Sequence, residues 1–142
     1  MTPQTIRKTL SPNDAGETGG HQAGILIPKD SRILSFFPAL DVEERNPRCH
    51  LLFEDPAGEV WELAFIYYNN RRFGGTRDEY RLTRLTRYIR QAMLGSGDEI
   101  VLRRNERGLY FIDHRFASSS PSILREPVLR LGSGWTVIDI AR

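Results

Sequence analysis

The sequence predicts a mainly β fold, an all-β barrel or sandwich interrupted by two short helices. Two observations indicate this class. Short segments rich in β-branched and aromatic residues recur along the chain, and turns containing glycine, proline or asparagine separate them. Such spacing is typical of barrels and sandwiches, whereas a parallel α/β sheet needs a helix between successive strands. With 142 residues, 39% of them hydrophobic, residues 1–142 are expected to form a single domain with one core.

Six strands follow directly from this pattern, and they are expected at residues 22–28, 48–54, 59–69, 99–104, 109–113 and 135–140. Turn signals separate several of them, at residues 55–58, 105–108 and 132–134. A seventh strand is expected to end at about Arg84, because Tyr80 and Leu82 alternate with polar residues and threonines follow. We therefore expect about seven strands.

Two short helices are expected between the strands. Residues 30–37 begin with a capping aspartate or serine and end before Pro38, which disfavours a helical residue in front of it. Residues 86–94 are closed by Gly95, and Tyr88, Ile89, Ala92 and Met93 can form their buried face. Arg87 and Arg90 are then expected on the solvated face of the second helix.

The choice of basic residue is more informative than the net charge of +2. Only Lys8 and Lys29 are lysines, so 18 of the 20 basic residues are arginines. The planar fork of arginine binds phosphates and guanine edges through two hydrogen bonds at once, which lysine cannot do. This composition favours a nucleic-acid partner, although a general bias of the genome toward arginine would also contribute to it.

A single cysteine, Cys49, excludes an intrachain disulfide and a zinc site built from cysteines. Its hydrophobic neighbours indicate a small buried side chain. No apolar run in the sequence resembles a signal peptide or approaches the ~18 residues of a membrane span. We therefore expect a cytoplasmic protein without a membrane partner.

Residues 9–24, called the first arm below, combine small hydrogen-bonding side chains with four glycines. Glycine allows a close backbone approach to a partner, and the polar side chains offer donors and acceptors at short reach. Such a segment is unsuited to a hydrophobic core and well suited to binding a partner.

Residues 69–81, called the second arm, begin a stretch that holds seven arginines between residues 71 and 90. Gly74 and Gly75 are expected to form the tip of the arm. Asp78 and Glu79 would repel phosphates, so their presence favours the reading of bases over general binding of a polyanion. The alternative is that they pair with neighbouring arginines and only reduce the repulsion among them.

Catalytic patterns are not found. A common metal-dependent nuclease centre needs an acidic residue two positions before a lysine, but Ile6 and Ile27 stand there. The three histidines, His21, His50 and His114, are scattered, and the sequence lacks the phosphate-binding loop of nucleotide hydrolases. Two other functions stay open: a metal-dependent nuclease of an unfamiliar type, and non-specific binding of RNA or another polyanion.

Two long segments resemble a known family. Residues 10–24 (LSPNDAGETGGHQAG), followed by Ile27 and Pro28, resemble the N-terminal effector domain of EcoRII-like restriction endonucleases. Residues 66–84 (IYYNNRRFGGTRDEYRLTR) resemble the same domain. Residues 88–101 are similar to the helix and Gly-Asp turn of plant DNA-binding pseudobarrels of the auxin-response-factor type. The resemblance spans roughly residues 6–115.

This resemblance implies a seven-stranded DNA-binding pseudobarrel whose two arms enter the major groove of double-stranded DNA. It also implies the effector role of a Type IIE restriction endonuclease, in which binding of a second site, CCWGG in EcoRII itself, controls cleavage by a separate catalytic domain. The domain itself would be non-catalytic, monomeric when isolated and free of cofactors. Mg²⁺ would be needed only by a separate nuclease domain, linked or associated. This chain would be the N-terminal fragment of a larger restriction enzyme.

The resemblance also assigns roles to particular residues. Lys8 would lie near the DNA backbone and His21 at the bases, and Arg77, Glu79 and Arg81 occupy positions of base-reading residues. With the polar residues of both arms, the candidate DNA-binding set is Lys8, Asn13, Asp14, Glu17, Thr18, His21, Gln22, Asn70, Arg71, Arg72, Thr76, Arg77, Asp78, Glu79, Tyr80 and Arg81. Gly75 and Tyr80 stand where the family pattern has lysines, so phosphate contacts or the reading of flanking bases would differ here.

Overall fold

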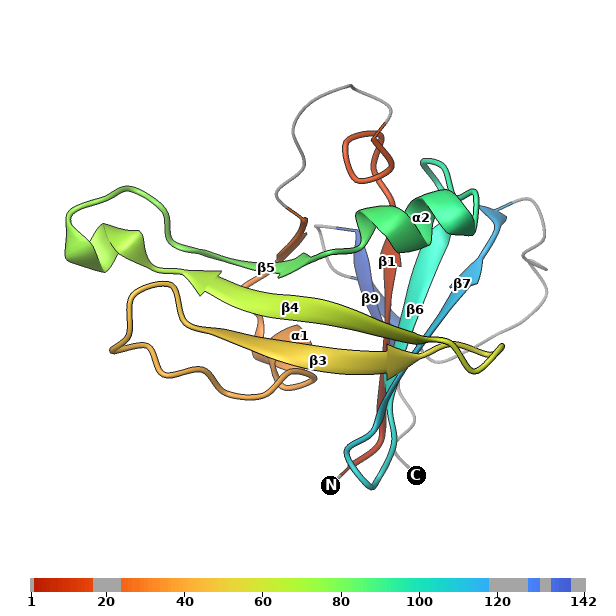
Figure 1. The fold of residues 1–142 in the computed structure, drawn as a ribbon, viewed down its shortest axis with the longest axis horizontal. Coiled ribbons are helices and arrows are strands. Elements are labelled where there is room, and N and C mark those ends of the chain that lie inside the picture. The colour runs from red at the N-terminus through yellow and green to blue at the C-terminus, as the bar shows by residue number, and fades with distance from the viewer. Residues whose placement is uncertain (1, 17–23, 118–127, 131–133, 139–142) are drawn as a thin grey trace.

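The structure is a computed structural model that describes residues 2–16, 24–117, 128–130 and 134–138. Nine strands in these residues form one sheet in the order β2-β5-β4-β3-β7-β6-β1-β9-β8 (Figure 1). Their bounds are β1 Gln4–Thr9, β2 Ile25–Ile27, β3 Arg48–Glu54, β4 Val60–Tyr68, β5 Glu79–Thr83, β6 Glu99–Arg104, β7 Tyr110–Arg115, β8 Val128–Arg130 and β9 Trp135–Ile138. The predicted mainly β class is confirmed.

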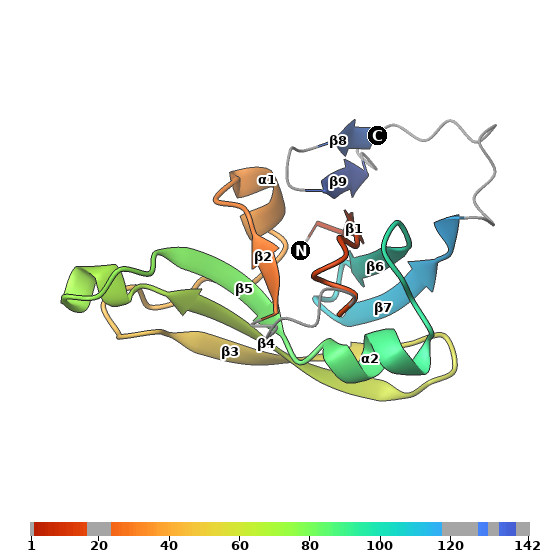
Figure 2. The ribbon, with the colours of Figure 1, turned by 90° about the horizontal axis from the view of Figure 1, so that it is seen from above.

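The sheet curls on itself, so that its two halves face each other (Figure 2). A short parallel pairing of β3 with β7 joins the halves, whereas every other strand pair is antiparallel. Across the opening, the indole Nε1 of Trp135 in β9 donates a hydrogen bond to the carbonyl oxygen of Leu26 in β2, at 2.9 Å. A side chain thus bridges the two halves where a closed barrel would have a strand ladder, and the fold is a pseudobarrel.

The core lies inside the curled sheet because alternate residues of each strand point inward. In β3 these are Leu51 and Phe53, and in β4 they are Trp61, Leu63 and Phe65. Burying one such side chain stabilises the fold by about 1.5–3 kcal/mol relative to leaving it exposed. The core therefore fixes which residues of β3, β4 and β5 face outward, and these form one wall of the site described below.

All seven expected strands are present, and β1 and β8 are additional. The strand β1 lies between β6 and β9, yet Arg7 and Lys8 in it are buried. Burial of these charges is possible because Arg7 lies 3.6 Å from Glu99 and Lys8 lies 3.0 Å from Asp14. Prediction from hydrophobic patterns does not place two adjacent charged residues in a central strand, and β1 was therefore not among the expected strands.

Both helices are shorter than expected. Helix α1 covers Ser31–Leu34, and Asp30 caps it by accepting a hydrogen bond from the backbone N–H of Arg32. Helix α2 covers Thr86–Gln91. The chain leaves α2 through Met93, which has a left-handed φ of 57°, and not through Gly95. The expected burial of Met93 is wrong, because 82% of it is exposed, whereas Tyr88 and Ile89 are buried as expected.

The end of the first arm lies next to β5, the strand into which the second arm leads. The first arm connects β1 to β2, and the second arm connects β4 to β5. Because β2 pairs with β5, with Ile25 opposite Leu82, the end of the first arm lies against the strand that follows the second. Within the described part of the chain, no helix is long and apolar enough to cross a membrane.

Candidate nucleic-acid interface

The described part of the first arm is a closed turn. The backbone N–H of Ser11 donates to the Asp14 carboxylate at 3.0 Å, and the N–H of Asp14 donates to the Ser11 hydroxyl at 3.1 Å. This reciprocal pair satisfies both donors and fixes the turn, as in a helix capping box. Asn13 lies exposed on the same turn. Glu17, Thr18, His21 and Gln22, four of the predicted DNA-binding residues, lie outside the described residues.

Lys8 lies beneath this turn. Its ammonium group forms an ion pair with Asp14 at 3.0 Å and donates to the carbonyl oxygen of Thr9 at 2.9 Å, while only 6% of the residue is exposed. Gly134 covers it so closely that a Cβ there would lie 2.9 Å from the Lys8 Nζ. The structure thus gives Lys8 and Asp14 a contact that supports the first arm, and their contact with DNA stays a prediction.

The tip of the second arm is closed by its own hydrogen bonds. A 3₁₀ helix covers Asn70–Phe73, and Gly74 after it has a left-handed φ of 95°. The side chain of Asn70 accepts a bond from the backbone N–H of Arg77 at 2.7 Å, and its carbonyl accepts from Gly75 at the same distance. A Cβ on Gly75 would lie 2.7 Å from the Asn70 side chain, which explains why a glycine fits this arm. Thr76 is exposed at the tip.

Asn69 anchors the base of the second arm, a role that the sequence pattern does not predict. Its side-chain amide donates to the carbonyl oxygens of Val42 at 3.1 Å and Glu44 at 2.7 Å. The side-chain oxygen accepts from the backbone N–H of Asn46 at 2.6 Å. Asn69 is 3% exposed, so these bonds hold the arm to the loop before β3. The only feature of the sequence that could have indicated this role is the position of Asn69, a polar residue directly after an apolar strand.

The residues of the second arm divide between two faces of the β4–β5 ribbon. Tyr68 pairs with Glu79, and Ile66 pairs with Arg81, so these four point to one face. That face carries Arg77, whose guanidinium carbon lies 3.8 Å from the centre of the Tyr68 ring. Of the predicted set, the structure thus brings together Arg77, Glu79 and Arg81 on this face.

Glu79 lies between the two arginines. Its Oε2 accepts a hydrogen bond from Nη2 of Arg77 at 3.0 Å and another from Nε of Arg81. The bond from Arg81 is the largest cause that holds the pKa of Glu79 below its ordinary value, and the bond from Arg77 adds to it. Glu79 is therefore ionised at neutral pH, and it orients both guanidinium groups.

Asp78 and Tyr80 lie on the opposite face of the ribbon. There Tyr80 stacks on Tyr67 with ring centres 4.2 Å apart and on Phe65 at 5.6 Å, and Phe65 stacks on Phe37 at 4.3 Å. This row of rings continues the core into the arm. Tyr80 thus stiffens the arm.

Asp78 holds the end of this row. It forms an ion pair with Lys29 at 2.7 Å and accepts a bond from the Tyr67 hydroxyl at 2.6 Å, which raises the pKa of Tyr67 to about 12. Arg71 lies 3.8 Å from Asp78, and Arg72 pairs with Glu43 at 2.6 Å. The structure therefore places Arg71, Arg72, Asp78 and Tyr80 apart from Arg77, Glu79 and Arg81. Their contact with DNA stays a prediction.

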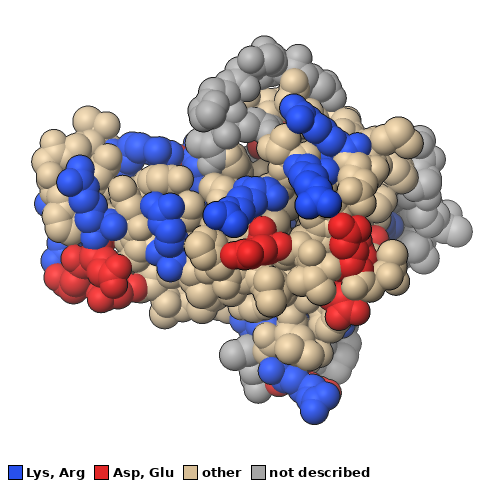
Figure 3. Space-filling view, viewed as in Figure 1, with Lys and Arg blue, Asp and Glu red and all other residues tan. Residues whose placement is uncertain are grey.

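A groove runs between the two arms. Its lining includes residues of the first arm, the second arm, β3 and the start of α2, namely Asp14, Gly24, Ile25, Arg48, Ile66, Tyr68, Arg77, Thr83, Arg84, Leu85, Thr86 and Ile89. Figure 3 shows lysine and arginine side chains extending from the second arm, at the left, across this face toward α2. Fewer acidic side chains lie among them and below them in this view. The lining thus combines the arginines Arg48, Arg77 and Arg84 with buried apolar residues such as Ile25 and Ile89.

The side chains of this surface can recognise a partner through hydrogen bonds and charge. Arginine forks can pair with phosphates or guanine edges, and a carboxylate can accept from the amino group of cytosine. Among the residues that the structure describes, no group of three or more histidine, cysteine, aspartate or glutamate residues could hold a metal ion.

Comparison with known protein families shows which family this chain belongs to. Residues 3–106, which include both arms, match the family described as "Restriction endonuclease EcoRII, N-terminal". The chain belongs to the EcoRII N-terminal domain family. It is 42% identical over 80 residues to the Type II restriction enzyme EcoRII of Escherichia coli, a match that covers 54% of this chain and 20% of that enzyme.

This EcoRII N-terminal domain is also similar to plant proteins. It is 31% identical over 109 residues to a putative B3 domain-containing protein of Oryza sativa subsp. japonica, which covers 76% of this chain and 32% of the plant protein. It is 32% identical over 104 residues to auxin response factor 16 of Arabidopsis thaliana, covering 73% of this chain and 14% of that factor. The matched segment is at most a third of each of these relatives, so it corresponds to one part of a larger protein.

Proposed function

We propose that this domain recognises a specific sequence in double-stranded DNA by placing both arms in the major groove. The observation that carries the proposal is that Arg77, Glu79 and Arg81 lie together on one face of the β4–β5 ribbon. Ile66 and Tyr68 of that face, and Arg77 itself, line the groove between the arms. Arginine matches guanine, and glutamate matches the amino group of cytosine, so this trio suits a site rich in G·C pairs.

The internal contacts of the trio are compatible with this function. In the free domain, Glu79 orients the two guanidinium groups and keeps them from repelling each other. On binding, hydrogen bonds from bases would replace part of these contacts, so the charged groups would exchange one partner for another. Preorganisation of this kind lowers the cost of ordering long side chains at an interface.

We further propose that the domain acts as the non-catalytic effector domain of a Type IIE restriction endonuclease in the cytoplasm. Binding of a CCWGG-like site would control cleavage by a linked or associated nuclease domain, and only that domain would use Mg²⁺. The similarity to EcoRII, which includes the second arm in the matched family segment, supports this proposal. The isolated domain would bind DNA as a monomer.

A titration of labelled duplexes tests the proposal. The duplexes contain CCWGG, a one-base variant or a scrambled sequence, and they are measured at physiological salt without metal. We expect binding to CCWGG to be tighter than to the scrambled duplex by ~10³-fold or more. Equal binding of all three would contradict sequence recognition and favour a general polyanion binder. Incubation with plasmid and Mg²⁺ or Mn²⁺ is the companion measurement, and cleavage that a carboxylate substitution abolishes would contradict the non-catalytic role.

A further inference from the structure

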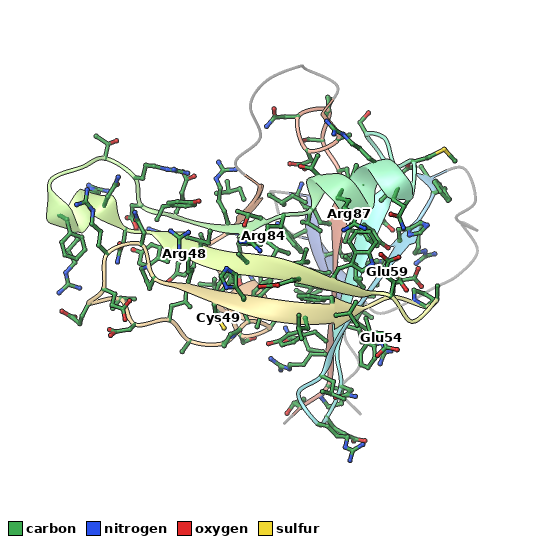
Figure 4. The ribbon with its side chains drawn as sticks, viewed as in Figure 1. Arg48, Cys49, Glu54, Glu59, Arg84 and Arg87 are labelled. Carbon is green, nitrogen blue, oxygen red and sulfur yellow. The ribbon has the colours of Figure 1, made fainter. Side chains whose placement is uncertain are left out.

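Three arginines outside the two arms share the face that carries the groove. They are Arg48 at the start of β3, Arg84 directly after β5, and Arg87 in α2, and we call them the arginine row. Arg48 and Arg84 line the groove between the arms, and Arg84 and Arg87 together line a neighbouring hollow. Figure 4 shows the three in a line along β4, from the second arm toward α2. The row therefore extends the basic surface away from the arms.

The charges of the arginine row are only loosely paired. Arg84 lies 3.8 Å from Glu62, and Arg87 lies 3.8 Å from Glu59. The Nε of Arg48 is 3.4 Å from the carbonyl oxygen of Asn46. Exposed pairs of this kind contribute little to stability, so exchanging them for a phosphate costs little.

Two contacts hold the row in place. The guanidinium carbon of Arg87 lies over the Trp61 ring, 5.2 Å from its centre, which restricts the side chain without neutralising it. Arg84 has a left-handed backbone with a φ of 71°. This conformation is unfavourable for an ordinary residue, and asparagine or glycine would adopt it more readily. An arginine at a position that disfavours it points to a role for its charged side chain.

We propose that the arginine row binds successive backbone phosphates of DNA held between the two arms. This inference rests on the proposed function and adds a second set of contacts to it. Arginine binds a phosphate through two parallel hydrogen bonds, and such contacts position the duplex without reading its sequence. The arms then select the sequence, whereas the row adds affinity that depends on salt.

The test replaces each arginine of the row and measures DNA binding over a range of salt concentrations. The variants are Arg48→Gln, Arg84→Asn and Arg87→Gln, alone and together. Asparagine is used at residue 84 because it tolerates the left-handed backbone, so the variant removes the charge and keeps the fold. Arg84→Lys retains the charge. Arg107→Gln is the matched control, because Arg107 is exposed in the turn between β6 and β7, away from the groove.

We expect the slope of log K against log salt to become shallower by about 0.9 for each phosphate that a variant no longer binds. Affinity should fall by the same factor for the CCWGG duplex and for the scrambled one, and Arg84→Lys should keep the slope of the parent. Arg107→Gln should leave both the affinity and the slope unchanged. Thermal melting of each variant shows whether it retains the fold.

Three outcomes would contradict the proposed role of the arginine row, and they can be told apart from failure of the proposed function. An unchanged slope in the triple variant means that the row does not touch phosphates. A loss of affinity confined to the CCWGG duplex means that it contacts bases. A parent domain that binds no duplex at all contradicts both proposals. A parent that binds all duplexes equally contradicts only sequence recognition, and the salt slopes then still decide the role of the row.

Discussion

Arg81 donates a hydrogen bond from its Nη1 to the carbonyl oxygen of Gly24, at 2.9 Å, and this bond joins the second arm to the end of the first. The Nε of the same guanidinium group binds Glu79, which also binds Arg77. A chain of polar contacts thus runs from the end of the first arm to Arg77 of the second. The two arms are therefore linked, and changes in one arm should affect the other.

Substitution of the base-reading residues should weaken specific binding. Arg77→Ala and Glu79→Ala are each expected to cost on the order of 1–3 kcal/mol on the cognate duplex, because each removes a hydrogen-bonding match to a base. Arg77→Lys keeps the charge but loses the fork, so it should recover the salt dependence and not the discrimination. Competition titration with cognate and one-base-variant duplexes, repeated at several salt concentrations, measures the discrimination between duplexes and the salt dependence of binding. If neither alanine variant weakens cognate binding, the assignment of the second arm is wrong.

Glu79 should make the stability of the domain depend on pH in the acid range. Because Arg81 lowers the pKa of Glu79 below 4.5 in the folded domain, the folded state favours the ionised carboxylate. This stabilisation is complete above the pKa of the unfolded chain, about 4.5, and is lost as pH falls through the lower folded pKa. Urea unfolding of parent and Glu79→Gln should differ by a constant amount above about pH 5.5, and the two should converge at lower pH. A difference that grows on acidification would contradict this.

Gly24 should tolerate no side chain. Its φ is +91°, and a Cβ would lie 2.5 Å from the carbonyl oxygen of Leu82. Gly58, in the turn between β3 and β4, has a nearly equal φ of +89° and open space around it. Gly58→Ala should therefore cost only the backbone strain, roughly 1–2 kcal/mol. Gly24→Ala should cost more, and it should also reduce DNA affinity because the first arm must shift. Equal unfolding free energies for the two variants would exclude the clash.

The bond between Tyr67 and Asp78 should stabilise the second arm. The hydroxyl donates to a carboxylate at 2.6 Å at the end of the aromatic row. Tyr67→Phe removes this donor and should lower the free energy of unfolding by about 1 kcal/mol. A double-mutant cycle with Asp78→Asn checks the assignment, because residues in contact show a coupling energy of at least about 0.5 kcal/mol. Additive effects would mean that the bond contributes nothing to stability.

Most of the fold could be predicted from sequence because apolar residues alternate along the strands that bound the core. The exceptions have tertiary causes. Strand β1 carries Arg7 and Lys8, which are compatible with a central strand only because Glu99 and Asp14 come to them from distant parts of the chain. The observed end of α2 differs from the predicted one because Met93 adopts the left-handed conformation that the pattern assigns to Gly95.

The position of the candidate site was also predictable, but its division into two faces was not. Both arms are visible as polar, glycine-containing segments. The register of β4 and β5 places Glu79 and Arg81 on the ribbon face of Ile66 and Tyr68, with Tyr80 on the opposite face, and a shift by one residue would reverse this. The arginine row could not be predicted, because Arg48 and Arg84 are brought to one groove only by the pairing of β3, β4 and β5.

Substitution of Lys8 can show whether this residue supports the first arm or contacts a DNA phosphate. Because its ammonium group is buried against Asp14, Lys8→Met should leave a buried carboxylate without this cation and lower the free energy of unfolding by about 3 kcal/mol. The double variant Lys8→Met/Asp14→Asn should recover part of this stability, because neither charge is then buried alone. The salt slope of DNA binding should stay that of the parent in the double variant. A slope shallower by about 0.9, with normal stability, would instead assign Lys8 to a phosphate of the DNA backbone.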